Sequence, residues 1–255
     1  MMALHPDFLR LPIAHRALHD YTLGRPENSR GAIRAAIAAG YGIEIDVQLS
    51  ADGVPMVFHD YALDRLTAER GPVRQRTSAE LGAIHLSGTQ EGIPTLAEVL
   101  EIVDGQVPLL VEIKDQDGAL GQQIGPLEEA TALLLRDYEG PVAVMSFNPH
   151  AVAAFGDLAP GVPVGLTTSA YQPNDWALLP AARGDELRHI PDFERVGAAF
   201  ISHEAKDLNA LRVSELKSLG VPVLCWTIRS VDEEALARRV ADNVTFEGYL
   251  SALPA

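Results

Sequence analysis

Short apolar runs alternate with helix-forming segments along most of this chain, and this alternation restricts the possible folds more than any other feature. The apolar runs have the length of strands, and several of the segments between them combine good helix formers with N-capping residues. Repeats of this kind place strands in one parallel sheet covered by helices. We expect eight strands, which begin at Leu11, Gly42, Val54, Val107, Pro141, Val162, Ala198 and Val221.

The length of the chain narrows the architecture. Its 255 residues are close to the roughly 250 that are usual for a (β/α)8 TIM barrel. The alternative is a doubly wound open sheet, but no glycine-rich phosphate loop follows the first strand. We therefore predict an α/β fold, a TIM barrel that forms a single domain over residues 1–255. A tight turn without a helix joins strands two and three, and a long irregular segment, residues 61–92, follows strand three.

The charge and the N-terminus exclude several classes of partner. A formal charge of −15 argues against nucleic acid, because nucleic-acid binders need lysine and arginine to displace phosphate counterions. The first ten residues lack the apolar core of a signal peptide, and no run approaches the roughly 18 apolar residues of a membrane span. We expect a cytoplasmic protein without a stable membrane anchor. Cys225 is the only cysteine, which excludes an intrachain disulfide, and it lies in an apolar run that predicts a buried position.

Two helices have clear start signals. Asn28 or Ser29 can cap a helix that continues through an alanine-rich segment and ends at Gly40. Thr95 and Glu98 have the spacing of a capping box, which predicts a helix to about Val103.

The segment from Ile43 to Asp60 carries the first candidate site. Glu44 and Asp46 alternate with aliphatic residues, so in a strand both carboxylates point to the same face. The turn at Asp52-Gly53 then leads to an apolar run that ends in His59-Asp60. Adjacent carboxylates repel each other and are stabilised by a cation. Taken alone, the two acids could equally lie solvated on a half-exposed strand.

Further polar residues follow the other expected strands. In a TIM barrel the active groups lie at the C-terminal ends of the strands. Those that we expect to meet there are His15, Arg16, Glu44, Asp46, His59, Glu112, Lys114 and Trp226. Any one of them has an ordinary structural explanation, but a set of charges at one end of a barrel is hard to explain as structure because charged groups are rarely buried unless paired or metal-bound.

This set of residues is suited to phosphodiester hydrolysis. Glu44, Asp46 and Glu112 can hold one divalent cation, and ligation by oxygen alone favours Mg²⁺ or Ca²⁺. Arg16 and Lys114 can offset the charge of the phosphate. His15 and His59 can supply a general acid and a general base on opposite sides of the phosphorus atom, because histidine titrates near neutrality.

The order and spacing of several motifs resemble those of the glycerophosphodiester phosphodiesterases. The match covers most of residues 11–114 and continues more loosely to Trp226-Thr227. Its motifs are His15-Arg16, Pro26-Glu27-Asn28-Ser29, Glu44-Ile45-Asp46, Asp52-Gly53, His59-Asp60, Leu63-Asp64-Arg65-Leu66-Thr67, Ile93-Pro94-Thr95-Leu96 and Val111-Glu112-Ile113-Lys114.

The resemblance implies a fold, a reaction and residue roles. It implies a TIM barrel that hydrolyses small glycerophosphodiesters, such as glycerophosphocholine or glycerophosphoethanolamine, to glycerol 3-phosphate and an alcohol. It assigns acid/base catalysis to the two histidines, metal ligation to the three acids, and phosphate contacts to Arg16 and Lys114. It also identifies residues 61–92 as a family insertion beside the substrate pocket.

Two positions depart from the family pattern. Ala17 stands where members usually carry glycine, in a loop that is somewhat long, and residues 244–248 lack the aspartate and proline that members often carry there. Substrate preference is therefore more open than reaction type. Lysophospholipids or another phosphodiester are alternative substrates, and a barrel that binds a phosphorylated ligand without catalysis is the alternative function. Trp176, Tyr171 and Trp226 are candidates to line a choline or alkyl pocket.

Overall fold

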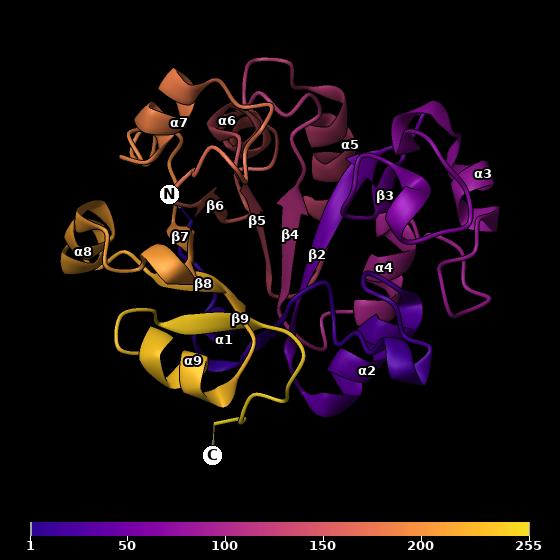
Figure 1. Cartoon of the computed structure of the whole chain (residues 1–255), viewed down its shortest axis with the longest axis horizontal. Helices are drawn as coiled ribbons and strands as arrows, with labels where there is room; N and C mark the ends of the chain where they lie inside the picture. Colours follow the sequence, from indigo (N-terminus) through magenta and orange to yellow (C-terminus); the bar gives the residue numbers. More distant parts are fainter. Residues whose placement is uncertain (1, 255) are drawn as a thin grey trace.

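The computed structural model describes residues 2–254 as a closed barrel of parallel strands surrounded by helices (Figure 1). Neighbouring barrel strands pair in the order β1-β2-β4-β5-β6-β7-β8-β9, and β9 pairs with β1 to close the ring. The barrel strands are β1 (Ile13–Ala14), β2 (Gly42–Leu49), β4 (Leu109–Ile113), β5 (Val142–Ser146), β6 (Val164–Thr168), β7 (Phe200–Glu204), β8 (Val223–Ile228) and β9 (Asn243–Phe246). The predicted TIM barrel is confirmed.

One of the eight expected strands does not belong to the barrel. β3 (Pro55–Val57) runs antiparallel to β2, with Val57 opposite Val47, and lies outside the ring. The tight turn before it allows only an antiparallel hairpin, because a parallel crossover needs a much longer connection. The eighth barrel strand is β9, which the sequence prediction missed because Asn243–Phe246 is short and mixes polar with apolar residues.

Helices cover the outside of the barrel, and one short helix closes the end at which the barrel strands begin. α1 (Asp7–Arg10) buries Phe8 in a cluster with Ile13 and Phe200 inside the barrel. The remaining helices are α2 (Arg30–Ala39), α3 (Ser78–Ala83), α4 (Leu96–Val103), α5 (Pro126–Leu135), α6 (Pro149–Leu158), α7 (Ala181–Leu187), α8 (Leu211–Ser218) and α9 (Val231–Ala237). The short 3-10 turns are η1 (Tyr21–Leu23), η2 (Leu63–Arg65), η3 (Val73–Gln75) and η4 (Ala205–Asp207).

The predicted helix ends are confirmed where local signals fix them. Ser29 caps α2 by accepting a hydrogen bond from the Ala32 N–H, and Gly40 ends the helix with a φ of 77°. Both bonds of the capping box between Thr95 and Glu98 are present at α4. Such ends depend on residues close in sequence, which is why the pattern alone predicted them.

The apolar residues form one large and several smaller clusters. The large cluster lies between strands and outer helices, where Cys225 is fully buried as predicted, and burial raises the pKa of its thiol to about 12. Residues 61–92 contribute Leu63 and Leu81 to a small separate cluster, which they share with Phe58 and with Met56 of β3. Among residues 2–254, no helix is both long and apolar enough to cross a bilayer.

Candidate active site

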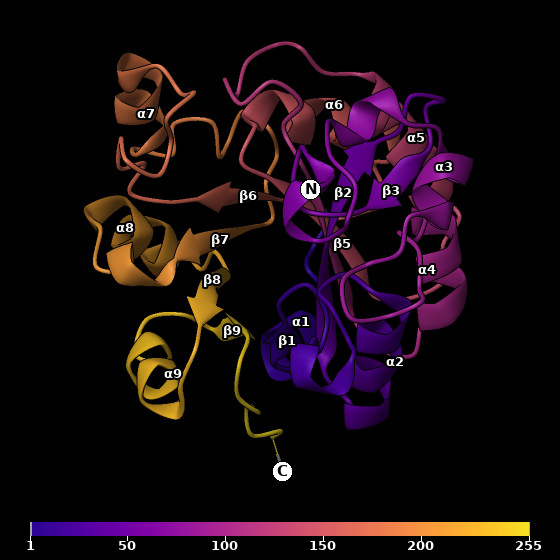
Figure 2. The same cartoon turned by 45° about the vertical axis from the view of Figure 1, so that its right-hand side comes forward.

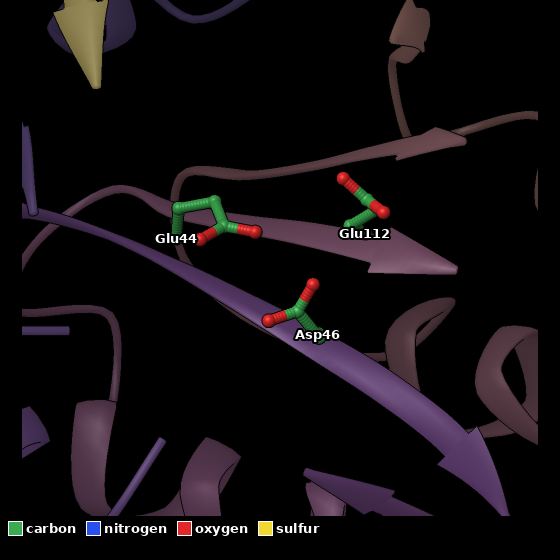
Figure 3. A group of neighbouring side chains, drawn as sticks. All are labelled: Glu44, Asp46 and Glu112. Carbon is green, nitrogen blue, oxygen red and sulfur yellow. The ribbon is translucent and has the colours of Figure 1, made fainter. Parts of the chain in front are cut away.

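Three carboxylates meet inside the barrel at its C-terminal end (Figure 3). Glu44 and Asp46 lie on β2, and Asp46 is in register with Glu112 on β4. The alternation of β2 therefore turns both acids inward, toward Glu112. One oxygen from each of the three lies within 4.8 Å of the others, and the residues are only 2%, 2% and 6% exposed.

Burial of three acids together is electrostatically costly. Burial and the neighbouring charges of Asp46 and Glu112 raise the pKa of Glu44 well above its usual range. Burial would also raise the pKa of Asp46, but the charges of His59, Lys114 and Arg16 outweigh it and lower that pKa. A set of carboxylate oxygens that repel each other in a buried site fits a hard divalent cation, whose charge would stabilise all three anions.

Asn28 orients the central acid of this group. Its amide Nδ2 donates to Asp46 Oδ2 at 3.0 Å, and the residue has a φ of 57°, in the left-handed region. The sequence offered Asn28 as an alternative helix cap, a role that Ser29 performs. Its contact with Asp46 was not predicted, because the two residues lie on different elements.

Two predicted cations flank the carboxylates. Lys114 Nζ lies 2.6 Å from Glu112 Oε1 and 3.4 Å from Asp46 Oδ1. Burial works against the ammonium, but these two acids raise the pKa of Lys114 above its ordinary value. Arg16 Nε lies 3.6 Å from Asp46 Oδ2 and has no hydrogen-bond partner among residues 2–254.

The backbone around Arg16 is held in a left-handed turn. Arg16 and Ala17 have φ values of 51° and 64°, and the turn directs the Arg16 N–H to Glu44 Oε2 at 2.8 Å. The Ala17 N–H donates to the Glu44 carbonyl oxygen at 3.0 Å. Ala17 thus adopts the conformation that glycine adopts more easily.

Each predicted histidine carries a carboxylate on its Nδ1. His15 Nδ1 lies 2.5 Å from Glu247 Oε2, and His59 Nδ1 lies 2.7 Å from Asp60 Oδ1. A carboxylate in this position fixes the tautomer and leaves Nε2 free to exchange a proton with a substrate. Burial lowers the pKa of His15, against the opposing effect of its hydrogen bond with Glu247. Glu247 follows β9, in the C-terminal segment that departs from the family pattern.

Glu247 also forms an ion pair with an arginine. Arg229 Nε donates to Glu247 Oε1 at 2.8 Å. Burial disfavours the Glu247 anion, but its hydrogen bond with His15, the His19 ring 3.7 Å away and the charge of Arg229 lower its pKa. Sequence reasoning missed both Glu247 and Arg229. A polar residue directly after a barrel strand is the signal that could have found Glu247, had β9 been recognised.

An ion-pair bridge joins residues 61–92 to the site. Arg65 donates through both terminal nitrogens to Glu27, each at 2.8 Å, and through Nε to Asp60 at 2.6 Å. Glu27 also accepts from Arg16 Nη1 at 2.8 Å. The Arg65 bridge, made of Arg65, Glu27 and Asp60, therefore connects the partner of His59 with the Arg16 side chain.

Trp226 lies on the opposite side of the barrel. It is on β8, which the strand order places diametrically opposite β4. Its indole Nε1 donates to the Ser202 carbonyl at 3.0 Å, and its ring packs edge-on against Phe147. The structure therefore places Trp226 at the barrel mouth, across from the carboxylates.

Comparison with known proteins identifies the family. The chain is 34% identical over 246 residues to the glycerophosphodiester phosphodiesterase of Caldanaerobacter subterraneus subsp. tengcongensis, with 92% of each chain covered. It is 34% identical over 250 residues to glycerophosphodiester phosphodiesterase 1 of Mus musculus, covering 87% of this chain and 72% of the relative.

A solved structure agrees with these relatives. An Oleispira antarctica phosphodiesterase in complex with the product sn-glycerol-3-phosphate is 29% identical, with a TM-score of 0.72 and 93% of each chain covered. A sequence model described as the glycerophosphoryl diester phosphodiesterase family matches residues 15–243. The chain therefore belongs to the glycerophosphoryl diester phosphodiesterase family and is a phosphoric diester hydrolase.

Proposed function

We propose that this enzyme performs metal-dependent hydrolysis of small glycerophosphodiesters, such as glycerophosphocholine and glycerophosphoethanolamine, to glycerol 3-phosphate and an alcohol. One observation carries the proposal: three buried carboxylates lie together, and each of the two nearby histidines is held at Nδ1 by a carboxylate. A binding protein has no need of such an acid/base pair. The product bound by the Oleispira antarctica relative supports the substrate class.

Glu44, Asp46 and Glu112 are the proposed ligands of one divalent cation, Mg²⁺ or Ca²⁺. When bound, the cation polarises the phosphoryl oxygens. The oxygen-only donor set supports this assignment, and so does the raised pKa of Glu44, because it reflects repulsion among the three acids that a bound cation would relieve.

Arg16 and Lys114 are the proposed phosphate contacts. Both lie within 4 Å of Asp46, so a phosphate bound at the carboxylates would meet two fixed positive charges. The Nε–H of Arg16 is the donor available for a phosphoryl oxygen. Such preorganised charges stabilise the negative charge that develops in phosphoryl transfer.

His15 and His59 are the proposed acid/base pair. β1, which ends before His15, pairs with the start of β2, whereas β3, which precedes His59, pairs with its end. Both histidines therefore reach the carboxylates of β2 from neighbouring segments, His15 after β1 and His59 after β3. Two such groups suit a base that activates water on one side of the phosphorus and an acid that protonates the leaving alcohol on the other.

The test is release of glycerol 3-phosphate by metal-stripped protein after Mg²⁺, Ca²⁺ or Mn²⁺ is returned. We expect activity only with added metal, and its loss in Glu44→Ala together with weaker metal binding by calorimetry. His15→Ala and His59→Ala should each lower kcat by roughly 10²- to 10⁴-fold while metal binding persists. A near-wild-type kcat in either histidine variant would remove that residue from the mechanism, and activity without metal would contradict the proposal.

A further inference from the structure

A cavity of about 240 Å³ opens between the C-terminal ends of β6, β7 and β8, which lie side by side (Figure 2). Its walls include Ser169, Trp176, Glu204, Lys206, Trp226 and Arg229. We propose that this head-group cavity binds the alcohol portion of the substrate and selects alcohols with a positive charge, such as choline and ethanolamine. The proposal rests on the proposed function and names the substrate class of that site.

The aromatic residues of the cavity have fixed positions. Trp176 and Trp226 both pack edge-on against Phe147, with ring centroids 4.8 and 5.4 Å away. The N–H of Trp226 is already bonded to the Ser202 carbonyl, so this indole offers the cavity ring surface and no hydrogen-bond donor. Aromatic faces attract ammonium groups, and quaternary ammonium most visibly, because the ring quadrupole is negative on the face.

Two acidic residues, Glu204 and Asp175, lie in the wall of the cavity and carry negative charge that no ion pair in the described part of the chain compensates. Glu204 accepts one hydrogen bond, from the Ala170 N–H at 3.2 Å. Within residues 2–254, neither Glu204 nor Asp175 has a lysine, arginine or histidine nitrogen within 4.0 Å. The wall also contains two cationic residues, but their charges are compensated or screened. Arg229 forms an ion pair with Glu247, and Lys206 is exposed, so water screens its charge.

The cavity wall contacts the carboxylate partner of the proposed acid/base residue His15. Arg229 forms part of its wall, its Nε lies 2.8 Å from Glu247, and Glu247 lies 2.5 Å from His15. A group bound in the cavity would therefore be separated from His15 by only two side chains. The volume of the cavity also suits choline or ethanolamine, because it would hold about eight water molecules at about 30 Å³ each.

The chain offers a direct optical test. Trp176 and Trp226 are its only tryptophans, so intrinsic fluorescence reports on this cavity alone. We expect choline chloride to change the fluorescence of the full chain in a saturable way. The carbon isostere of choline, in which a tert-butyl group replaces the trimethylammonium group, should bind more weakly.

Glu204→Gln separates a charge effect from a shape effect. We expect it to weaken choline binding about fivefold or more and to leave binding of the carbon isostere unchanged. Glu101→Gln is the matched control, because Glu101 is an exposed acid on α4 and its replacement changes the net charge equally. Asp175→Asn provides a second variant if Glu204→Gln does not fold, as judged by circular dichroism.

Turnover provides the second test. Wild type should have a higher kcat/KM for glycerophosphocholine and glycerophosphoethanolamine than for glycerophosphoglycerol by about tenfold, and Glu204→Gln should remove most of that preference. Equal binding of choline and its carbon isostere, or an unchanged preference in Glu204→Gln, would overturn the inference. Choline binding that depends on Glu204, in a chain that hydrolyses no glycerophosphodiester, would instead contradict the proposed function alone.

Discussion

At the scale of single residues, the carboxylate partners of the two histidines decide how the site can work. A neutral imidazole has one protonated nitrogen, and the partner at Nδ1 decides which one it is. Asp60 follows His59 directly, whereas Glu247 reaches His15 from the far end of the chain. The segment that departs from the family pattern therefore supplies the carboxylate that contacts His15.

Glu247→Gln tests this positioning role. The Glu247 carboxylate raises the pKa of His15 against the effect of burial, so its removal should lower that pKa further. We expect kcat to fall at least about tenfold and the pH–rate limb that belongs to His15 to move to lower pH. The measurement is the pH profile of kcat, with Glu101→Gln as a control of equal charge change. A profile that superimposes on that of wild type would exclude the role.

The other departure from the family pattern is accommodated by the backbone. Ala17 keeps the left-handed turn, which costs an alanine about 1–2 kcal/mol relative to the right-handed conformation. Its methyl group is 2% exposed and packs in the large apolar cluster. Ala17 therefore retains the turn that aims the Arg16 N–H at Glu44, and part of its strain is offset by burial.

At the scale of elements, the Arg65 bridge connects residues 61–92 to the candidate site. Arg65 comes from η2, within residues 61–92, and its guanidinium contacts the acids that hold His59 and Arg16. The planar guanidinium can serve two carboxylates at once, which the ammonium of lysine does with much less geometric control. Residues 61–92 are thus connected to His59 through Asp60 and to Arg16 through Glu27.

Arg65→Ala should lower kcat about tenfold or more and change KM less, because the residue positions other groups and does not bind the substrate itself. Arg65→Lys should restore only part of the loss. Arg76→Ala is the matched control, since Arg76 also lies within residues 61–92 but, in the described part of the chain, forms an ion pair only with Glu69, at 3.5 Å. Because Arg65 acts through Asp60, its effect on kcat and that of Asp60→Asn should not add. Full additivity would show that Arg65 does not act through Asp60.

The elements also show which features the sequence could predict. The alternation along β2 and the caps of α2 and α4 depend on neighbours in sequence, so the pattern predicted them. The contact of Arg65 with Glu27 joins residues 38 positions apart, and that of His15 with Glu247 joins residues 232 apart. Nothing local specifies such pairs. The exchange of β3 for β9 in the strand count has a different cause, because the tight turn before β3 already requires an antiparallel hairpin and β9 is short and mixes polar with apolar residues.

At the scale of the whole molecule, the site concentrates opposite charges within an acidic protein. The net charge of −15 repels anionic substrates at long range. Near the carboxylates, however, Arg16, Lys114 and Arg65 lie within one network of ion pairs. The phosphate of a glycerophosphodiester is therefore attracted only at short range, where these side chains and the proposed cation act together. Higher salt should screen the long-range repulsion more than the buried network.

The same network should make the free energy of unfolding decrease at acid pH. Burial opposes ionisation of Glu27, but Arg65 and Arg16 lower its pKa from 4.5 to about 2. Below its usual pKa the unfolded chain binds a proton that the folded chain does not, so the stabilisation is fully present above pH 4.5 and disappears as the pH falls through about 2. The shift corresponds to a contribution on the order of 3 kcal/mol.

Glu27→Gln should therefore lower the free energy of unfolding at pH 7 by an amount of that order, and its difference from wild type should shrink steadily between pH 4.5 and pH 2. Urea denaturation at several pH values measures both quantities, with Glu101→Gln as the control for net charge. Other buried acids titrate in the same window, but they are common to both proteins and cancel in the difference. A difference that stays constant down to pH 2 would mean that the ion pairs of Glu27 contribute nothing to folding, and that Arg65 holds the site together through Asp60 alone.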